Sequence, residues 1–292
     1  MNWCEDLSRF ELHIGESGYP EQLAESPDPP PVLYGLGDPC SLAPGLGVVG
    51  ARKSTPYGLA AAQYFAGWAG GAGYVVVSGG AIGCDQAAHR AALASGGRSV
   101  AVMAGGADVH YPRSASSMLR AIATNGAVVS EHPWGTQPQK WTFRTRNRII
   151  AGLSMALLVL EAALGSGTFS TADYALAAGR DVLAIPGSIY APECAGANRL
   201  IRQGATPITD ADELCLALEG LLGPPARDPT PWAPASAGGD DPVLAAVRTN
   251  PQRPDDLARA LGLDVVTIVR LLGVMETTGQ VVRFRDGRYG PR

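Results

Sequence analysis

Short apolar runs alternate with helix-like segments throughout residues 46–218, and this alternation restricts the fold more than any other feature of the chain. The runs hold few polar residues, which is typical of strands buried on both faces in a parallel sheet covered by helices. Six runs are expected to be strands: Leu46–Gly50, Tyr74–Ser78, Ser99–Met103, Ala127–Ser130, Ala156–Glu161 and Asp181–Ile185. Five segments are expected to be helices: Leu59–Gly70, Asp85–Ala94, Ser116–Thr124, Asn147–Leu153 and Thr171–Ala178. The predicted fold class is α/β, with a doubly wound, mostly parallel sheet.

Composition divides the chain into four parts. Residues 1–45 are expected to be a short acidic N-terminal lead-in with a formal charge of −7, and residues 46–218 a Rossmann-like domain with a charge of +3. Residues 219–242 are rich in proline, glycine and alanine without apolar periodicity, so they are predicted to be a linker. Residues 243–292 again carry +3. Both segments expected to fold are mildly basic, so the total charge of −4 does not exclude nucleic acid as a partner.

The C-terminal residues 243–292 change in character. Three helix signals precede a hairpin with an Asp-Gly turn: Val243–Arg248, Pro254–Ala260, Val265–Thr277, then Gln280–Phe284 and Arg288–Tyr289. This order predicts a winged helix-turn-helix domain. Its presumed recognition helix, Val265–Thr277, is mostly apolar. We therefore expect it to contact a protein, or to touch duplex DNA only through the wing arginines Arg283, Arg285 and Arg288.

Several classes of protein are not supported by the sequence. No apolar run is long enough for a membrane span, and the N-terminus is acidic, unlike a signal peptide, so the chain is predicted to be cytosolic with no membrane partner. The 5 cysteines are scattered and never spaced as CxxC, and the 4 histidines lack metal-ligand spacing. No catalytic constellation stands out. We therefore expect no catalytic residue, no metal site and no cofactor, and predict that the chain is not an enzyme.

Three loops of small residues follow predicted strands and favour binding of an anion. Glycines at a strand end permit a tight turn, and the helix that follows offers free N–H groups to a phosphate. Formal positive charge is added at the first loop by Arg52 and Lys53. Because the carboxyl ends of parallel strands meet at one edge, the loops are expected to converge there. Their candidate binding residues are Gly50, Ala51, Arg52 and Lys53, then Ser78 and Gly79, and finally Ser166, Gly167 and Thr168.

The segment from Lys140 to Arg148 (KWTFRTRNR) is the strongest single indication of function. It carries four positive charges and no acid, with Trp141 and Phe143 between the cations. Cations contact phosphates while aromatic rings stack on bases, a sequence-tolerant mode typical of proteins that bind single-stranded nucleic acid. The segment is therefore expected to bind single-stranded DNA.

A set of motifs resembles the DprA/Smf family, the DNA-processing proteins of bacterial transformation. The motifs occur in the family's order over roughly Tyr19 to Asp212: GARKSTPYG, SGGAIGCD, GGADVHYP, VVSEHPWG, FRTRNRIIAGLS, EAALGSGTFSTA and IPG…GANRLIRQGA. The resemblance implies an extended Rossmann fold, a homodimer, binding and protection of incoming single-stranded DNA, and loading of the RecA recombinase without an enzymatic step. The C-terminal winged helix also resembles a module that many members carry.

The resemblance also assigns roles to individual positions. Arg52 corresponds to the family's phosphate-gripping arginine, and Lys140 and Phe143 to its DNA-contacting lysine and aromatic residue. Arg146, Asn147 and Arg148 match its RNR core. The extra charge of Arg144, where the family often has proline, is included among the candidate contacts, as is Asn198 in the last motif.

Two other functions stay open. A nucleotide phosphoribohydrolase of the LOG type has a related fold and a PGGxGTxxE motif. Here Gly167-Thr168 fits part of that motif, but Thr171 occupies the place of its catalytic glutamate. The other alternative is a nucleotide-sensing regulator whose winged helix binds duplex DNA.

Overall fold

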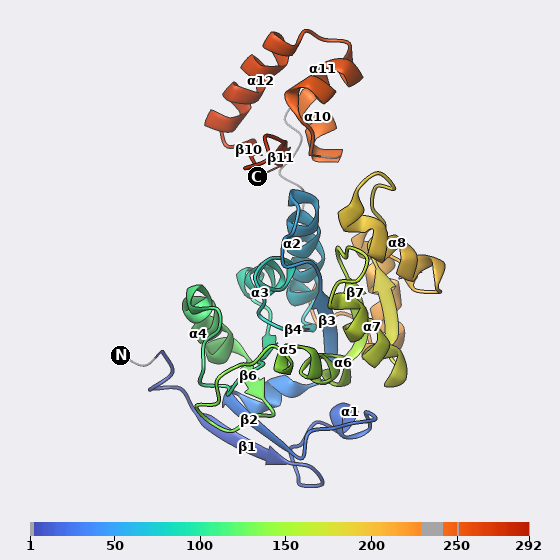
Figure 1. Cartoon of the computed structure of the whole chain (residues 1–292). Helices are drawn as coiled ribbons and strands as arrows, with labels where there is room; N and C mark the ends of the chain where they lie inside the picture. Colours follow the sequence, from blue (N-terminus) through green and yellow to red (C-terminus); the bar gives the residue numbers. More distant parts are fainter. Residues whose placement is uncertain (1–2, 229–241, 250, 292) are drawn as a thin grey trace. The chain divides into compact units, whose positions relative to one another are not determined.

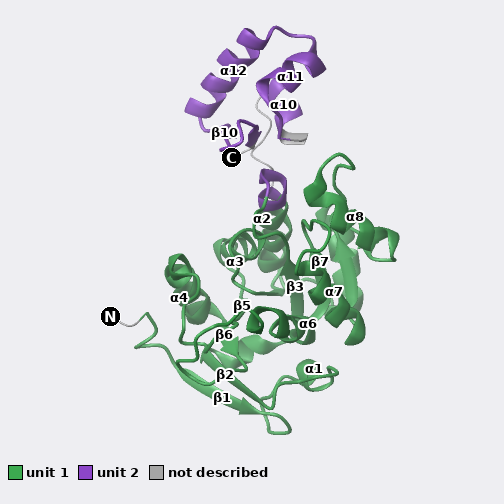
Figure 2. Cartoon of the chain, in the orientation of Figure 1, with its two compact units in different colours: residues 1–54, 61–232 green, residues 55–60, 233–292 purple. Residues whose placement is uncertain are grey.

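The computed structural model describes residues 3–228, 242–249 and 251–291. The chain forms two compact units, one of Met1–Ser54 with Ala61–Trp232 and one of Thr55–Ala60 with Ala233–Arg292 (Figure 2). Of the predicted linker 219–242, residues 229–241 lie outside the described residues. Its ends are helical instead, since residues 219–222 belong to α9 (Ala211–Leu222) and Pro242 begins α10 (Pro242–Thr249). No helix in the described part of the chain has the length and apolar character needed to cross a membrane.

A nine-stranded sheet forms the centre of the large unit (Figure 1). Its spatial order is β1-β2-β6-β5-β4-β3-β7-β8-β9, and the pairings from β6 to β9 are all parallel. The predicted α/β fold with a mostly parallel sheet is therefore confirmed. The strands are β1 (Arg9–His13), β2 (Val32–Gly37), β3 (Gly45–Val49), β4 (Val75–Ser78), β5 (Ser99–Val102), β6 (Ala127–Ser130), β7 (Ser154–Val159), β8 (Asp181–Ala184) and β9 (Thr206–Pro207).

Residues 1–45, expected to be an acidic lead-in, belong to this sheet. Strand β1 pairs antiparallel with β2, and β2 pairs antiparallel with β6. Between them lies the short helix α1 (Glu21–Ala24), whose Leu23 is fully buried. Composition did not reveal these strands, because the acidic residues of this region lie mostly outside them, and the one in β1, Glu11, is exposed, while Leu33 and Leu36 of β2 enter the core. The large unit therefore begins well before residue 46.

Helices cover both faces of the sheet and create two hydrophobic cores. Helices α3 and α4 pack against β3, β4, β5 and β6 on one face, and α6 and α7 pack against β7 and its neighbours on the other. Alternate residues of one strand serve the two cores: Val100 and Val102 of β5 face one, and Ala101 faces the other. The helices are α2 (Pro56–Gly71), α3 (Cys84–Ala94), α4 (Ser116–Asn125), α5 (Thr142–Thr145), α6 (Asn147–Leu153), α7 (Thr168–Ala177), α8 (Ala195–Arg202) and α9 (Ala211–Leu222).

Two glycines shape the edge at which the parallel strands end. A Cβ on Gly50, directly after β3, would lie 2.6 Å from Cys84 Sγ, so only glycine lets this loop approach the start of α3. Gly83 has a φ of +97° and would bring a Cβ against the carbonyl of Ala51. The loops after β3 and β4 are thereby held against each other at the carboxyl edge.

The described C-terminal residues of the small unit form three helices followed by a hairpin. Helices α10 (Pro242–Thr249), α11 (Pro254–Leu261) and α12 (Val265–Thr277) precede strands β10 (Val281–Arg283) and β11 (Tyr289–Pro291), which pair antiparallel. Asp264 caps α12, since its carboxylate accepts the Thr267 N–H at 2.9 Å. The core of this unit is made of aliphatic residues and Tyr289, so it has a hydrophobic centre of its own.

Candidate nucleic-acid interface

A cleft of about 850 Å³ opens at the carboxyl edge of the sheet in the large unit. Segments that are far apart in the sequence form it: the loop after β3, the loop after β4 with the start of α3, the segment around α5 and α6, the loop that enters α7, and Glu193. Many of the candidate residues line it: Gly50, Ala51, Arg52, Lys53, Lys140, Phe143, Arg144, Arg146, Asn147, Ser166, Gly167 and Thr168. The structure thus brings together the first and third small-residue loops and the basic segment.

A second, apolar hollow of about 320 Å³ adjoins this cleft. The two cavities share Arg52, Lys53, Ala81 and Phe143. The other residues of the hollow come from the loops after β4 and β5 and from the loop before α5: Gly79, Ile82, Met103, Ala104, Gly105, Tyr111, Pro112 and Pro138. The site therefore has a larger cleft that carries cations and a smaller apolar hollow beside it.

Aromatic rings stand where the two cavities meet. The Arg52 guanidinium lies over the Phe143 ring, 5.1 Å from its centroid, and the Tyr111 and Phe143 centroids are 5.4 Å apart. Tyr111 is 52% exposed, so half of its surface remains available for contact. A ligand with a flat ring can stack at this position while its anionic groups face Arg52.

Arg146 is the buried anchor of the cleft. Its Nη1 donates to the Gly79 carbonyl at 2.6 Å and to the Val102 carbonyl, and a Cβ on Gly79 would collide with the guanidinium. Asp85 holds the same turn, since its Oδ2 accepts the N–H of Gly79 at 3.2 Å and of Ala81 at 3.4 Å. Arg146 thus positions the loop after β4 from within.

Burial shifts the pKa values of both charged anchors. Desolvation lowers the pKa of Arg146 to about 10, although the negative charge of Asp85 opposes this change. Burial raises the pKa of Asp85, against the lowering effects of Arg146 and of the hydrogen bonds from Ala81 and Gly79. The two side chains therefore compensate each other's charge inside the protein.

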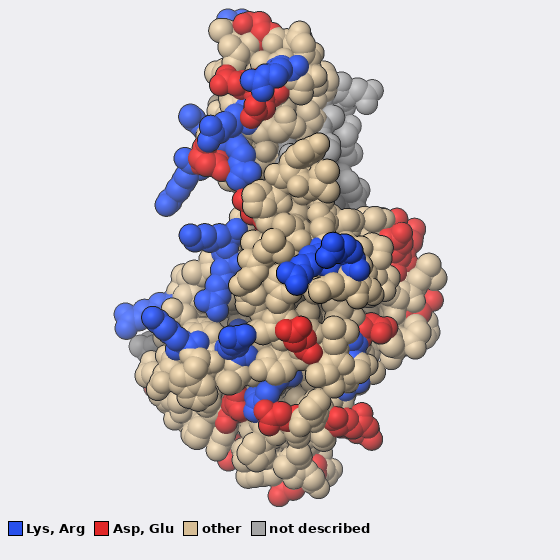
Figure 3. Space-filling view, turned by 45° about the vertical axis from the view of Figure 1, so that its right-hand side comes forward, with Lys and Arg blue, Asp and Glu red and all other residues tan. Residues whose placement is uncertain are grey.

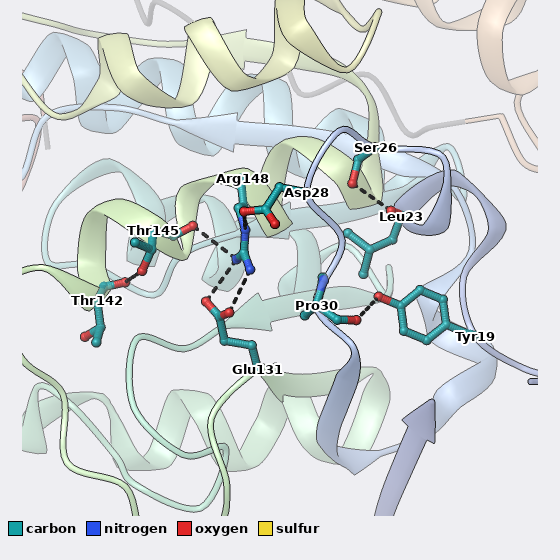
Figure 4. Close-up of polar contacts among 9 residues, drawn as sticks. All are labelled: Tyr19, Leu23, Ser26, Asp28, Pro30, Glu131, Thr142, Thr145 and Arg148. Carbon is teal, nitrogen blue, oxygen red and sulfur yellow. Dashed lines mark hydrogen bonds and ion pairs between the residues drawn. The ribbon is translucent and has the colours of Figure 1, made fainter. Parts of the chain in front are cut away.

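Arg148 does not reach the cleft. Its Nε donates to Asp28 Oδ2 at 2.7 Å, and its Nη1 and Nη2 donate to the Glu131 carboxylate at 2.9 and 2.8 Å (Figure 4). The side chain is only 13% exposed. The basic segment predicts Arg148 as a DNA contact, whereas in the structure its charge joins β6 and α6 to the loop that contains Asp28.

Two other candidates also lie outside both cavities. The Ser78 hydroxyl is fully buried and donates to the Val48 carbonyl at 2.6 Å, which ties β4 to β3. Asn198 forms a pair of hydrogen bonds with the Gly187 backbone, at 2.9 and 3.1 Å. Ser78 and Asn198 therefore stabilise the backbone through these hydrogen bonds and do not line the site. Asn147 differs from them, since it lines the cleft and donates to Ser170 Oγ at 3.1 Å.

The sequence analysis assigned no role to Tyr111, Met103 and Pro138 in the apolar hollow. Tyr111 and Pro112 stand in the motif GGADVHYP, which was noted without a function for its side chains. Aromatic and apolar residues in a loop can also be part of the packed core, so the sequence alone could not predict that these residues line a cavity. Their role in the hollow depends on β5 and α5 being brought together by the fold.

Charged side chains of both signs line the cleft. Arg52, Lys53, Lys140 and Arg144 are exposed, and no ion pair of theirs with an acid occurs among the described residues. The acids that line the cleft are Asp85, Asp173 and Glu193. The visible face of the molecule carries basic and acidic groups on a largely uncharged surface (Figure 3). No group of His, Cys, Asp and Glu in the described part of the chain has the arrangement of a metal site.

The chain matches known protein families over most of its length. The family model of DNA recombination-mediator protein A matches residues 11–219, and that of the DprA winged helix domain matches residues 227–287. DNA processing protein DprA of Bacillus subtilis is 40% identical over 205 residues, which are 70% of this chain and 69% of its own. Protein Smf of Escherichia coli is 34% identical over 292 residues, covering 98% and 78% of the two chains.

Two solved structures are similar over most of the large unit. DprA from Streptococcus pneumoniae has a TM-score of 0.68 and 38% identity, covering 73% of this chain and 75% of its own. DprA from Helicobacter pylori, a protein studied for its single-stranded DNA binding mode, has a TM-score of 0.67 and 28% identity, covering 75% and 99%.

Proposed function

The chain belongs to the DNA recombination-mediator protein A family, also called DprA or Smf, and on this premise we propose that it binds single-stranded DNA without an enzymatic step. In this proposal it protects incoming single-stranded DNA and loads the RecA recombinase during natural transformation and recombination. The observation that carries the proposal is that exposed cations, which form no ion pair among the described residues, line a cleft next to an apolar hollow with aromatic walls.

Single-stranded DNA suits both parts of this cleft. Phosphates along the strand would contact Arg52, Lys53, Lys140 and Arg144, while an unstacked base would enter the hollow beside Phe143 and Tyr111. Duplex DNA offers phosphates but keeps its bases stacked and paired. It would therefore contact the cations of the cleft without placing a base in the hollow. A preference for single strands is therefore expected.

The proposed contacts follow the lining residues. They are Gly50, Ala51, Arg52, Lys53, Gly79, Lys140, Phe143, Arg144, Asn147, Ser166, Gly167 and Thr168. Arg146 is proposed to act as a positioning residue, because its guanidinium is already bound to two backbone carbonyls.

Fluorescence anisotropy tests the proposal directly. Labelled oligothymidylate and a matched duplex are titrated with the full chain over a range of salt concentrations, using the wild type and an Arg52→Ala/Lys140→Ala variant. We expect tight binding to the single strand that weakens steeply with salt, with a slope of about −0.7 per phosphate contact. The double variant should lose most of this affinity and keep the wild-type unfolding curve. Binding to duplex alone, or to neither DNA at low salt, would refute the proposal.

Recombinase loading and self-association are further parts of the proposal. A protein that delivers a recombinase is expected to raise the rate at which RecA displaces a single-strand-binding protein from DNA. That rate is measured by the DNA-dependent ATPase of RecA, with the Arg52→Ala/Lys140→Ala variant as control. Homodimerisation is tested by sedimentation velocity, and a cytosolic location by cell fractionation.

The absence of an enzymatic step rests on the residue in the place of the LOG-type catalytic glutamate. Thr171 occupies it and is 2% exposed within the cleft wall. A threonine cannot supply the carboxylate that this hydrolysis requires. Nucleoside monophosphates are therefore expected to remain intact when incubated with the full chain, and release of free base would refute this part.

The winged helix unit is proposed as a contact for a protein or for duplex DNA. Its helix α12 exposes Val266, Val269 and Val274, whereas Arg283 and Arg285 are exposed on the hairpin. Arg283→Ala/Arg285→Ala should weaken any duplex binding and leave the single-strand affinity of the large unit unchanged.

A further inference from the structure

Trp141 lies beside the cleft, held in place and exposed. Its side chain is 57% exposed, and it lines neither the cleft nor the apolar hollow. Each of the other tryptophans in the described residues, Trp3, Trp68 and Trp134, is buried or partly buried. Single exposed apolar side chains are common on protein surfaces, so what distinguishes Trp141 is its place in the basic segment beside the cleft.

The indole is fixed by contacts on its own loop. Its Nε1 donates to Gln139 Oε1 at 2.8 Å. The neighbouring Thr142 is buried, and its hydroxyl both accepts from Gln139 N at 3.0 Å and donates to Gln139 O at 2.8 Å. A ring that is already ordered loses little conformational entropy when a ligand stacks on it.

His132 supports the indole and still leaves it a free face. The two rings meet at 90° with their centroids 6.0 Å apart. In an edge-to-face pair, only one of the two rings presents a face to its partner. His132 therefore covers at most one face of Trp141.

The position of Trp141 extends the cleft along the edge of the sheet. Phe143 contacts Arg52, after β3, and Tyr111, after β5, whereas Trp141 contacts His132, after β6. Strand β6 is the neighbour of β5 on the side away from β3. Trp141 therefore lies towards the β6 side of the ring pair formed by Phe143 and Tyr111.

Positive charge connects the two aromatic positions. Lys140 precedes Trp141, and Arg144, whose backbone N–H donates to the Trp141 carbonyl at 3.0 Å, follows one turn later. Both cations are exposed and line the cleft. A DNA strand that leaves the hollow towards β6 would keep its phosphates on these cations as its next bases reach the indole.

From this arrangement we propose that Trp141 is a second stacking platform, which binds a nucleobase of the same single strand outside the hollow. The inference rests on the proposed function and adds to it a direction for the strand and a second base site. Stacking on an indole does not depend on hydrogen-bonding groups of the base, so the platform would accept any nucleobase.

Oligonucleotide length separates the two base sites in an experiment. The full chain is titrated with oligothymidylates from a dinucleotide upward, as wild type, Trp141→Ala and Trp141→Phe. For the longer oligonucleotides, Trp141→Ala should weaken binding by about 5- to 150-fold, which is the range for loss of one stacked base. Trp141→Phe should restore most of the affinity. For the dinucleotide the three proteins should agree, and the salt slope should not change, because no charge is removed.

Intrinsic fluorescence supplies a readout independent of affinity. Stacking of a base should quench Trp141, so the quenching caused by long oligothymidylate should be lost in Trp141→Phe and retained in Trp134→Phe. Trp134 is a matched control because it lies outside both cavities and its indole N–H is bound to Glu11 at 2.8 Å.

The outcomes separate the two proposals. If the wild type binds long oligonucleotides but Trp141→Ala binds them equally well and quenching persists in Trp141→Phe, the platform is refuted and the proposed function stands. If the wild type binds no single-stranded DNA, both are refuted.

Discussion

The two ends of the segment Lys140–Arg148 have similar compositions and opposite environments. Lys140 and Arg144 are exposed at the cleft, whereas Arg146 and Arg148 are 4% and 13% exposed and bound to carbonyls or carboxylates. The difference arises because α6 packs on the sheet, so the arginines at its start face the fold. Positive charge in this segment thus has two uses: two exposed cations, with no ion pair among the described residues, can hold a ligand, and two bound ones hold the site.

Removing the buried anchor should have the largest effect. In Arg146→Met the carbonyls of Gly79 and Val102 lose a donor, and the buried carboxylate of Asp85 loses the positive charge that compensates it. We expect the free energy of unfolding to fall by about 3–5 kcal/mol, because an uncompensated charge stays buried. Urea denaturation followed by circular dichroism measures this loss. A second change, Asp85→Asn, should recover part of the stability, and a cost below 1 kcal/mol for Arg146→Met would show that this end of the segment does not anchor the fold.

Replacing Arg148 should lower stability without weakening DNA binding. Arg148→Met leaves Glu131, whose side chain is 16% exposed, without its ion pair, at a cost of about 2 kcal/mol in the free energy of unfolding. Asp28 is 78% exposed, so Asp28→Asn should cost much less. Anisotropy of labelled oligothymidylate should give the same affinity for Arg148→Met and wild type. A large loss of affinity in a stably folded Arg148→Met protein would instead place this arginine in the DNA site.

The different roles of Arg146 and Arg148 could not be predicted from the sequence, although much of the fold could. The six strands β3 to β8 and the helices α2, α3, α4, α6 and α7 could be predicted, because continuous apolar runs alternate with helix-like segments. The elements α5, α8, α9 and β9 of the same region were not predicted. The strands β1 and β2 could not be predicted, since only one of their faces is buried and they are surrounded by acidic residues. Within the basic segment, the sequence could not separate Arg148 from Arg144, because the acceptors of Arg148 lie on Asp28 and Glu131, far from it in the chain.

The free energy of unfolding should also depend on pH, because His89 is buried and the positive charge of Arg146 acts on it. The Ser99 hydroxyl donates to the Val76 carbonyl, so His89 Nδ1 donates to Ser99 Oγ at 2.8 Å and Nε2 is unprotonated. Burial, followed by the charges of Arg146 and Arg90, lowers the pKa of His89 from 6.5 to about 3. Between these values the unfolded chain binds a proton that the folded chain does not.

The sign of this dependence follows directly. As pH falls from 6.5 towards 3, His89 should lower the free energy of unfolding by about 1.4 kcal/mol per pH unit. His89→Asn keeps a donor for Ser99 and removes the titration. Urea denaturation at several pH values should therefore give a shallower loss of stability for the variant than for wild type. Identical slopes would mean that His89 is protonated in the folded protein.

The smallest effect is expected at the exposed end. Arg144→Ala removes a side chain with no ion pair among the described residues, so the free energy of unfolding should change by less than about 0.5 kcal/mol. Loss of one phosphate contact should weaken oligothymidylate binding severalfold at low salt and reduce the slope of log affinity against log salt by about 0.7. In the same salt series, Arg148→Met should keep the wild-type slope of log affinity against log salt. The two variants therefore serve as controls for each other. If Arg144→Ala lowers stability but keeps the wild-type slope, the distinction between free and bound cations in this segment is wrong.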